Sequence, residues 1–256
     1  RLHNFFRSST SARVRAALYL KGLCYEYVPY VLRAGETRTK EYLERNAQGL
    51  IPTLELPDGT HLSQSLPIME WLEEMHPTPP LLPRNPIARA RVRGLAQMLA
   101  CEVHPLNNLR VLLHLRDTYG ADDAAQATWF VHWVKTTFDA MEAALADNSD
   151  TGRFCHGDSP SMADICLVAQ VWNNRRFDLK PDHWPTLARI HAACLDVPEI
   201  AAAAPEQQPA AGGQPRAARA LRRFRKVLHE TSVDPAWRSD ADAPQAASCS
   251  VSVALV

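Results

Sequence analysis

Five prolines stand within the ten residues 77–86, PTPPLLPRNP, and they limit the possible folds of this chain more than any other feature. Proline lacks a backbone N–H and cannot continue a helix interior or a central strand. The stretch therefore predicts a stiff linker between two parts of the chain. With 256 residues, of which 46% are hydrophobic, the chain is long enough for each part to bury a core of its own.

The part before the linker, residues 1–76, has the pattern of a mixed α/β domain. LHNFF suits a short strand, residues 9–11 can cap the helix that follows, and Lys21-Gly22 is a good signal for its end. YEYVPYVL suits a strand whose proline indicates a sheet edge or a strand end. IPTLELPDGTHLSQS suits a hairpin that turns at residues 57–59, and PIMEWLEEMH suits a helix. The predicted order is strand, helix, strand, helix, strand, strand, helix.

The part after the linker, residues 87–204, is predicted to be helical throughout. Ser161 and Asp164 precede an apolar run with the spacing of a capping box, which indicates a helix start rather than a catalytic pair. Residues 205–256 are rich in alanine, proline and charge, which predicts a disordered tail. A basic amphipathic helix in RAARALRRFRKVLHE is the alternative interpretation of part of that tail.

Charge and cysteine usage restrict the partners and the compartment. The 28 basic and 28 acidic residues balance, which argues against a nucleic acid or a membrane surface as partner. No apolar run approaches the roughly 20 residues of a membrane span, and the first residues lack a signal-peptide pattern. Six scattered cysteines without a C-x-x-C pair predict free thiols and hence the cytoplasm. His114, His132 and His156 lack metal-ligand spacing, so no metal site is expected.

Arg7, Ser8, Ser9 and Thr10 occupy the predicted turn from the first strand to the first helix. Small side chains leave the backbone N–H groups of a helix N-terminus accessible, and such a terminus favours an anion. An ordinary helix cap would use the same residue types. The spacing by itself leaves both interpretations open.

Several blocks of the sequence resemble one known family in the same order. RSSTSARVRAAL is similar to the signature of the zeta-class glutathione transferases, with Thr10 where a cysteine usually stands. IPTLELPDG, QSLPIMEWLEE, HPLNNLR, GDSPSMADICLVAQV and RRF extend the resemblance over residues 1–205. It implies a thioredoxin-like α/β domain in residues 1–76 followed by an all-α domain in residues 87–204, with glutathione as cofactor. Within the class, the chain resembles bacterial glutathione-dependent maleylpyruvate isomerases most, with maleylacetoacetate isomerases as the near alternative.

The resemblance implies a role for individual residues. Ser8 would stabilise the glutathione thiolate, Ile51 would precede a cis proline beside the cysteinyl part, and the pair Gln64-Ser65 would hold the γ-glutamyl end. The full set of implied glutathione-binding residues is Ser8, Ser9, Thr10, Thr37, Ile51, Pro52, Gln64, Ser65, His104 and Asn108. The implied catalytic residues are Ser8 together with the three substrate-side arginines Arg7, Arg110 and Arg176. Arg13 is expected to be structural or to face an interface.

These roles imply a glutathione-dependent cis–trans isomerase of a small maleyl dicarboxylate. Addition of the thiolate makes the central double bond single, so that it can rotate, and arginines stabilise the charge that grows on the substrate. Maleylpyruvate, converted to fumarylpyruvate in aromatic catabolism, is the expected substrate, because Arg110 is placed to draw in a second carboxylate on a short dianion. Maleylacetoacetate isomerase is the alternative.

Two rival classes differ in what they require. A general glutathione transferase needs no arginine clamp, and a non-catalytic module usually lacks the hydroxyls that this chain retains at Ser8 to Thr10. The family also pairs, which predicts a homodimer formed through residues 61–76 and the start of the helix after residue 87.

Overall fold

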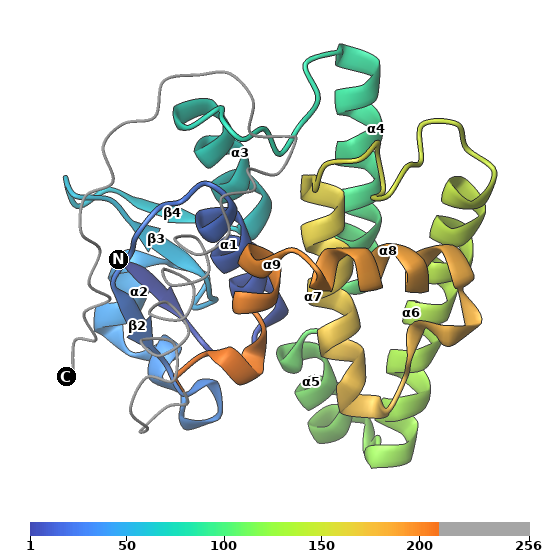
Figure 1. Cartoon of the computed structure of the whole chain (residues 1–256). Helices are drawn as coiled ribbons and strands as arrows, with labels where there is room; N and C mark the ends of the chain where they lie inside the picture. The colour runs from blue at the N-terminus through green and yellow to red at the C-terminus, as the bar shows by residue number, and fades with distance from the viewer. Residues whose placement is uncertain (210–256) are drawn as a thin grey trace. The chain divides into compact units, whose positions relative to one another are not determined.

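The computed structural model of the protein describes residues 1–209. These residues form two compact units, one made of Arg1–Pro80 together with the segment that begins at Val197, the other of Leu81–Asp196 (Figure 1). The division after Pro80 falls inside the proline-rich stretch 77–86. The basic segment of the predicted tail lies within residues 210–256, outside the described residues.

The first unit is built around a four-stranded mixed sheet with the strand order β2-β1-β3-β4. The strands are β1 (Leu2–Asn4), β2 (Tyr27–Pro29), β3 (Thr53–Glu55) and β4 (His61–Ser63). β1 runs parallel to β2 and antiparallel to β3, and β3 and β4 form the predicted hairpin. Pro29 lies on the edge strand β2, where a missing N–H does not interrupt the sheet.

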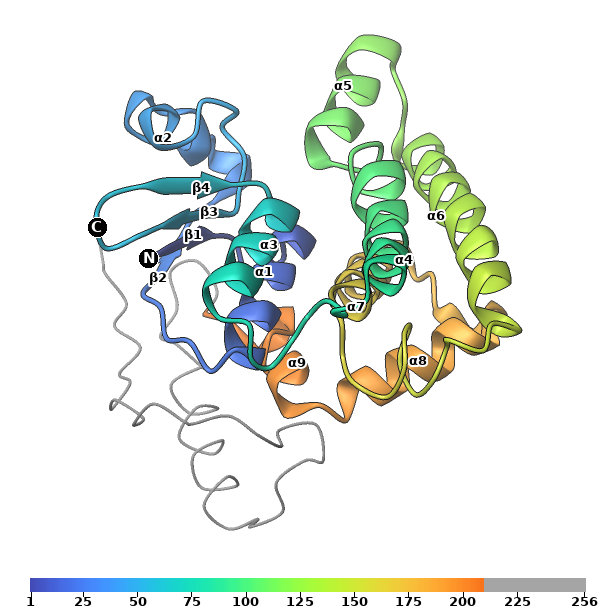
Figure 2. The same cartoon turned by 90° about the horizontal axis from the view of Figure 1, so that it is seen from above.

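Helices cover both faces of this sheet. Figure 2 shows α1 (Ser9–Leu20) and α3 (Ser65–Met75) on one side and α2 (Lys40–Arg45) on the other. Short 3-10 turns at Leu32–Ala34 and Glu36–Arg38 precede α2. The cap of α1 is Ser8, not one of residues 9–11 as predicted: Ser8 has extended backbone, and its hydroxyl accepts from the Ser11 N–H. A hydroxyl at the last extended residue reaches the N3 donor, and Ser8 is that residue.

Arg15 is fully buried on α1 and joins distant parts of the first unit. Its guanidinium donates to Asn4 Oδ1 at 3.0 Å, to Phe6 O at 3.1 Å and to Ala203 O at 3.0 Å. The carbonyl of Ala203 follows helix α9 (Pro198–Ala202), which contacts α1.

The segment from Val197 therefore groups with the first unit and not with the predicted helical domain of residues 87–204. A helical pattern shows that α9 forms but not which neighbour it packs on. The start of the predicted tail is ordered, contrary to the prediction: Pro205–Gln207 form a 3-10 turn, and the amide of the buried Gln208 donates to Ala202 O at 2.6 Å.

The second unit is helical, as its sequence pattern predicts. It contains α4 (Pro86–Gln97), α5 (Leu109–Tyr119), α6 (Asp123–Ala146), α7 (Met162–Asn174) and α8 (Pro185–Leu195), a π-helical segment at Met98–Val103, and 3-10 turns at Arg175–Phe177 and Pro181–His183. α7 is buried over its whole length and contacts α4 and α8. The predicted capping box at its start is present, with the Ser161 N–H donating to Asp164 Oδ2 at 2.8 Å. Across residues 1–209, the helices are all too short or too polar to traverse a bilayer.

The structure tests the predicted free thiols at four cysteines. Cys155, Cys166 and Cys194 are buried free thiols and Cys101 is an exposed one. Free thiols are thus confirmed at these four cysteines, and Cys249 lies outside the described residues.

His191 on α8 gives the second unit a pH-dependent stability. Burial, with a smaller contribution from the positive charge of Arg175, lowers the pKa of His191 from 6.5 to about 4. Between these values the unfolded chain binds more protons than the folded one. The stabilisation is therefore complete above pH 6.5 and is lost as the pH falls toward 4.

We expect His191→Gln to flatten this pH dependence. Protonation of the wild-type side chain costs about 1–3 kcal/mol across the window, allowing for partial solvent screening. Thermal melts from pH 7.5 to 4.5 measure the effect, with His114→Gln on the exposed face of α5 as matched control. Parallel melting curves for the wild type and His191→Gln would contradict the assignment.

Candidate functional site

The N-terminus of α1 forms the first part of the candidate site. Ser8 caps the helix, with its hydroxyl oxygen 3.2 Å from the Ser11 nitrogen, and is half-buried. The first turn of α1 contains no acidic side chain. Its positive end therefore has no carboxylate of its own in that turn, and this favours an external anion beside the Ser8 hydroxyl.

Thr10 connects this helix start to the loop before β3. Its hydroxyl lies 2.8 Å from Ser8 Oγ and donates to the Ile51 carbonyl oxygen at 3.1 Å. Because Thr10 has one hydroxyl proton and directs it to Ile51, Ser8 is the donor between the two hydroxyls. The peptide bond between Ile51 and Pro52 is cis, as expected. The Ile51 carbonyl can accept a second hydrogen bond, so it can still pair with a peptide.

The N-terminus of α3 forms the second part. Ser65 is its first residue and is 5% exposed, while the preceding Gln64 is exposed with φ = 69°. A non-glycine residue held at positive φ costs about 1–3 kcal/mol, and such residues concentrate at ligand sites. The Gln64 amide donates to Gln48 Oε1 at 2.6 Å, and the first turn of α3 also lacks an acidic residue.

Arg13 places a buried cation behind the start of α3. It is 1% exposed, and its Nη1 donates to Ser65 Oγ at 3.3 Å. Within residues 1–209, its Nε and Nη2 have no hydrogen-bond partner although both are buried. A buried guanidinium with unused donors needs a compensating anion. The positive charge behind Ser65, together with the N-terminus of α3, favours a carboxylate at this helix start, such as the one at the γ-glutamyl end of glutathione.

Two further residues of the first unit that were predicted to contact glutathione are buried. Ser9 is 6% exposed in the first turn of α1, and Thr37 is 4% exposed in the 3-10 turn before α2. The whole Thr37 residue, backbone included, is buried, which leaves little of it for a ligand to contact. The structure thus brings Ser8, Thr10 and Ile51 together directly and gives Ser65 a separate charged neighbour in Arg13.

In the second unit, the residues predicted to contact glutathione lie at the start of α5. Asn108 caps α5 by accepting from the Arg110 N–H at 3.1 Å, and its amide lies 3.4 Å from His104 Nε2. The π-helical segment Met98–Val103 leads directly into His104. π-helical turns of this kind frequently occur at functional sites.

The predicted arginines are all exposed. Arg7 lies with its guanidinium carbon 5.8 Å from the centre of the Phe6 ring, and Arg176 lies 5.5 Å from that of Phe177. Arg176 also donates to Asn173 at the end of α7, and Arg110 projects from the first turn of α5. A planar guanidinium binds carboxylates well, which is the property that the predicted roles of these arginines require.

Sequence reasoning missed two residues of this region. Arg13 was expected to be structural or to face an interface; its burial beneath Ser65 agrees with a structural position, but its unused donors were not foreseen. The contact between Arg13 and Ser65 could not be predicted from the sequence around Arg13, because it forms only when α3 packs on α1. Gln48 is the second, because its contact with Gln64 depends on the path of an irregular loop.

Comparisons with known proteins agree with this geometry. Residues 7–75 match the family model of the glutathione S-transferase N-terminal domain. A maleylpyruvate isomerase from Ralstonia sp is 44% identical over 209 residues, which cover 82% of this chain and 98% of that protein.

Two solved structures are similar as well. One is a holo maleylpyruvate isomerase described as a bacterial zeta-class glutathione S-transferase, with TM-score 0.79, 44% identity and coverage of 81% of this chain and 98% of that one. The other is a maleylacetoacetate isomerase from Methylobacterium extorquens AM1 with bound malonate and glutathione. Its TM-score is 0.79 at 39% identity, with coverage of 81% and 97%.

Proposed function

Because this chain belongs to the zeta-class glutathione S-transferase family of maleylpyruvate and maleylacetoacetate isomerases, we propose that it is a glutathione-dependent cis–trans isomerase acting on maleylpyruvate. The observation that carries the proposal is the start of α1. Ser8 presents a hydroxyl at a helix N-terminus without acidic residues, within a chain similar to a maleylpyruvate isomerase over 98% of that protein's length.

The first unit would hold glutathione through three groups of residues. Ser8 and Thr10 would lie at the sulfur, Ile51 before the cis proline would pair with the cysteinyl backbone, and Ser65 backed by Arg13 would hold the γ-glutamyl carboxylate. The other assigned contacts, at Ser9, Thr37, Pro52, Gln64, His104 and Asn108, remain predictions from the resemblance. Bound glutathione would supply a thiolate able to add to a conjugated double bond and leave again.

The chain's own residues would perform the remaining work. Ser8 and the N–H groups of α1 lower the free energy of a negatively charged sulfur relative to a thiol. Arg7, Arg110 and Arg176 would neutralise the two substrate carboxylates and the charge that develops during rotation of the bond. The dicarboxylate malonate in the Methylobacterium extorquens enzyme supports a site for diacids in this family.

We further propose a cytoplasmic homodimer. Two large apolar side chains of the predicted contact segments are exposed, Met75 at 59% on α3 and Ile87 at 83% on α4. Burial of such side chains against a second copy would be favourable.

The test follows isomerisation of maleylpyruvate and of maleylacetoacetate with glutathione, with cysteine and without thiol. We expect no turnover without thiol and poor turnover with cysteine, because the γ-glutamyl and glycyl ends position the sulfur. We expect the higher kcat/KM for maleylpyruvate, with a margin of about 1–3 kcal/mol in transition-state binding.

Each result bears on a different part of the proposal. Equal rates under all three thiol conditions would overturn the cofactor. A tenfold preference for maleylacetoacetate would reassign the substrate and leave the reaction type in place.

A further inference from the structure

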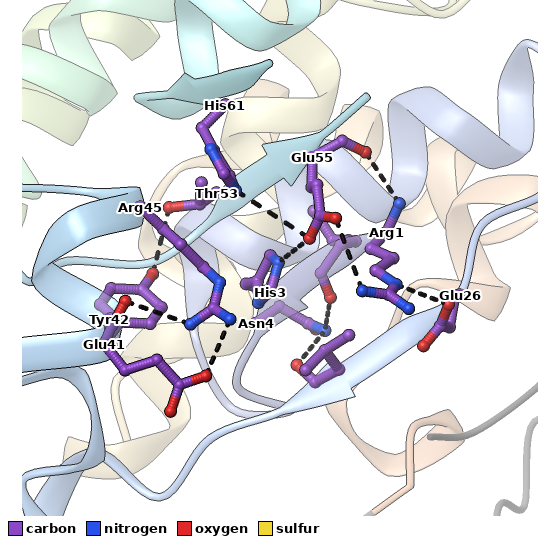
Figure 3. A network of polar contacts seen from close by, with 12 residues as sticks. Arg1, His3, Asn4, Glu26, Glu41, Tyr42, Arg45, Thr53, Glu55 and His61 are labelled. Atoms are coloured by element: carbon purple, nitrogen blue, oxygen red, sulfur yellow. Dashed lines mark hydrogen bonds and ion pairs between the residues drawn. The ribbon is translucent and has the colours of Figure 1, made fainter. Parts of the chain in front are cut away.

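Three strands of the sheet bring two histidines and a glutamate together on one face. Glu55 on β3 is paired with His61 on β4, and His3 on β1 is paired with Thr53, two residues before Glu55. Alternate residues of a strand point to the same face. His3, Glu55 and His61 therefore project side by side from β1, β3 and β4, as Figure 3 shows.

The distances within this cluster suit a single small cation. His3 Nε2 lies 2.9 Å and His61 Nε2 4.0 Å from Glu55 Oε2, and one ligand atom from each of the three residues lies within 4.8 Å of the others. Ligands of a tetrahedral zinc ion, with bonds of about 2.0–2.2 Å, are separated by distances within this range. On binding one ion, the three ligand atoms would adjust their separations to about 3.3–3.6 Å, the edge length of such a tetrahedron.

One polar atom of the cluster has no partner without such an ion. His61 Nε2 is buried and makes no hydrogen bond within residues 1–209, since 4.0 Å from Glu55 is too long for one. A buried ring nitrogen without a partner is unfavourable. A cation between Glu55 and His61 would satisfy both atoms.

The surroundings can adapt to a metal ion. His3 Nδ1 lies 2.9 Å from the Tyr30 hydroxyl, which can accept as well as donate a hydrogen bond. Tyr30 can therefore fix the tautomer that leaves the His3 Nε2 lone pair for a metal, which is the usual role of a hydrogen-bond partner behind a histidine ligand.

The neighbouring positive charges are compensated. Arg45 on α2 pairs with Glu41 at 2.8 Å, and Arg1 pairs with Glu26 at 2.9 Å and more loosely with Glu55 Oε1 at 3.5 Å. The second oxygen of Glu55, Oε2, is the one that faces both histidines.

We propose that His3, Glu55 and His61 bind a zinc-class divalent cation that ties β1, β3 and β4 together. Two imidazoles and one carboxylate suit Zn²⁺, whereas Mg²⁺ and Ca²⁺ prefer oxygen ligands only. Glu55 and His61 are 20% and 27% exposed in their side chains, which leaves room for water as the fourth ligand. No spacing pattern in the sequence indicates this site, because each ligand comes from a different strand.

The experiment titrates the chelator-treated full chain with Zn²⁺ by calorimetry, without glutathione, and records the visible spectrum with Co²⁺. We expect one ion per chain, a tetrahedral Co²⁺ spectrum without a thiolate band, and a higher melting temperature with zinc. His61→Gln and Glu55→Gln should each weaken binding at least about tenfold and abolish the thermal shift. Circular dichroism verifies that both variants are folded.

Two controls separate this site from adventitious binding. His114→Gln removes an exposed histidine of α5, and Cys101→Ser removes the exposed thiol; both should bind zinc like the wild type. Wild-type affinity in folded His61→Gln and Glu55→Gln, loss of binding in Cys101→Ser, or no binding by the wild type would overturn the proposal.

Discussion

Ser8→Ala is expected to lower kcat at saturating glutathione by about 100- to 1,000-fold, the effect of removing one donor to a developing anion. The Ser8 hydroxyl lies at the positive end of α1; its single proton, directed to Thr10 without a ligand, would turn to a bound thiolate. Without it, only the helix N-terminus would favour the thiolate, so the pKa of the bound glutathione thiol should rise. Ultraviolet titration of the thiolate in the complex measures that pKa directly.

Two variants isolate the role of the Ser8 hydroxyl from its role as helix cap. Loss of the cap alone costs about 1 kcal/mol of stability. Ser8→Thr keeps both hydroxyl and cap and should retain most activity. Thr10→Val removes the neighbouring hydroxyl, which donates to Ile51, and should leave the thiol pKa nearly unchanged. If Thr10→Val raises the thiol pKa and Ser8→Ala does not, the stabilising hydroxyl belongs to Thr10.

Arg15→Met is expected to destabilise the protein by about 3–5 kcal/mol, because it breaks a buried hydrogen-bond network and leaves several neutral acceptors without a donor. Arg15 is 0% exposed. Its guanidinium donates hydrogen bonds to the side-chain oxygen of Asn4 and to the carbonyl oxygens of Phe5, Phe6 and Ala203. Methionine would fill part of the volume but would leave these acceptors without donors.

Urea unfolding measures this loss. Arg33→Met, at an exposed position of the same unit, is the matched control and should change stability by less than about 0.5 kcal/mol. Arg15→Lys should fall near Arg15→Met, because one ammonium cannot reproduce a planar fork of donors. Stability of Arg15→Met close to that of the control would show that the network contributes little.

The sequence by itself determined the features that depend on neighbouring residues. The hairpin turn at residues 57–59 and the capping box of Ser161 with Asp164 follow from local backbone chemistry, and the family resemblance implied the cis bond before Pro52. The family blocks, read in order, also indicated the fold and the glutathione chemistry. Short-range patterns suffice there because each residue's preference acts over only a few positions.

The tertiary structure alone decided what depends on contacts between distant segments. Arg13 acquires its role from α3, and Arg15 binds a carbonyl 188 residues further along the chain. His3, Glu55 and His61 meet only through the pairing of three strands. None of these contacts follows from periodicity or spacing, because packing and strand register, rather than local propensity, determine which distant side chains come together.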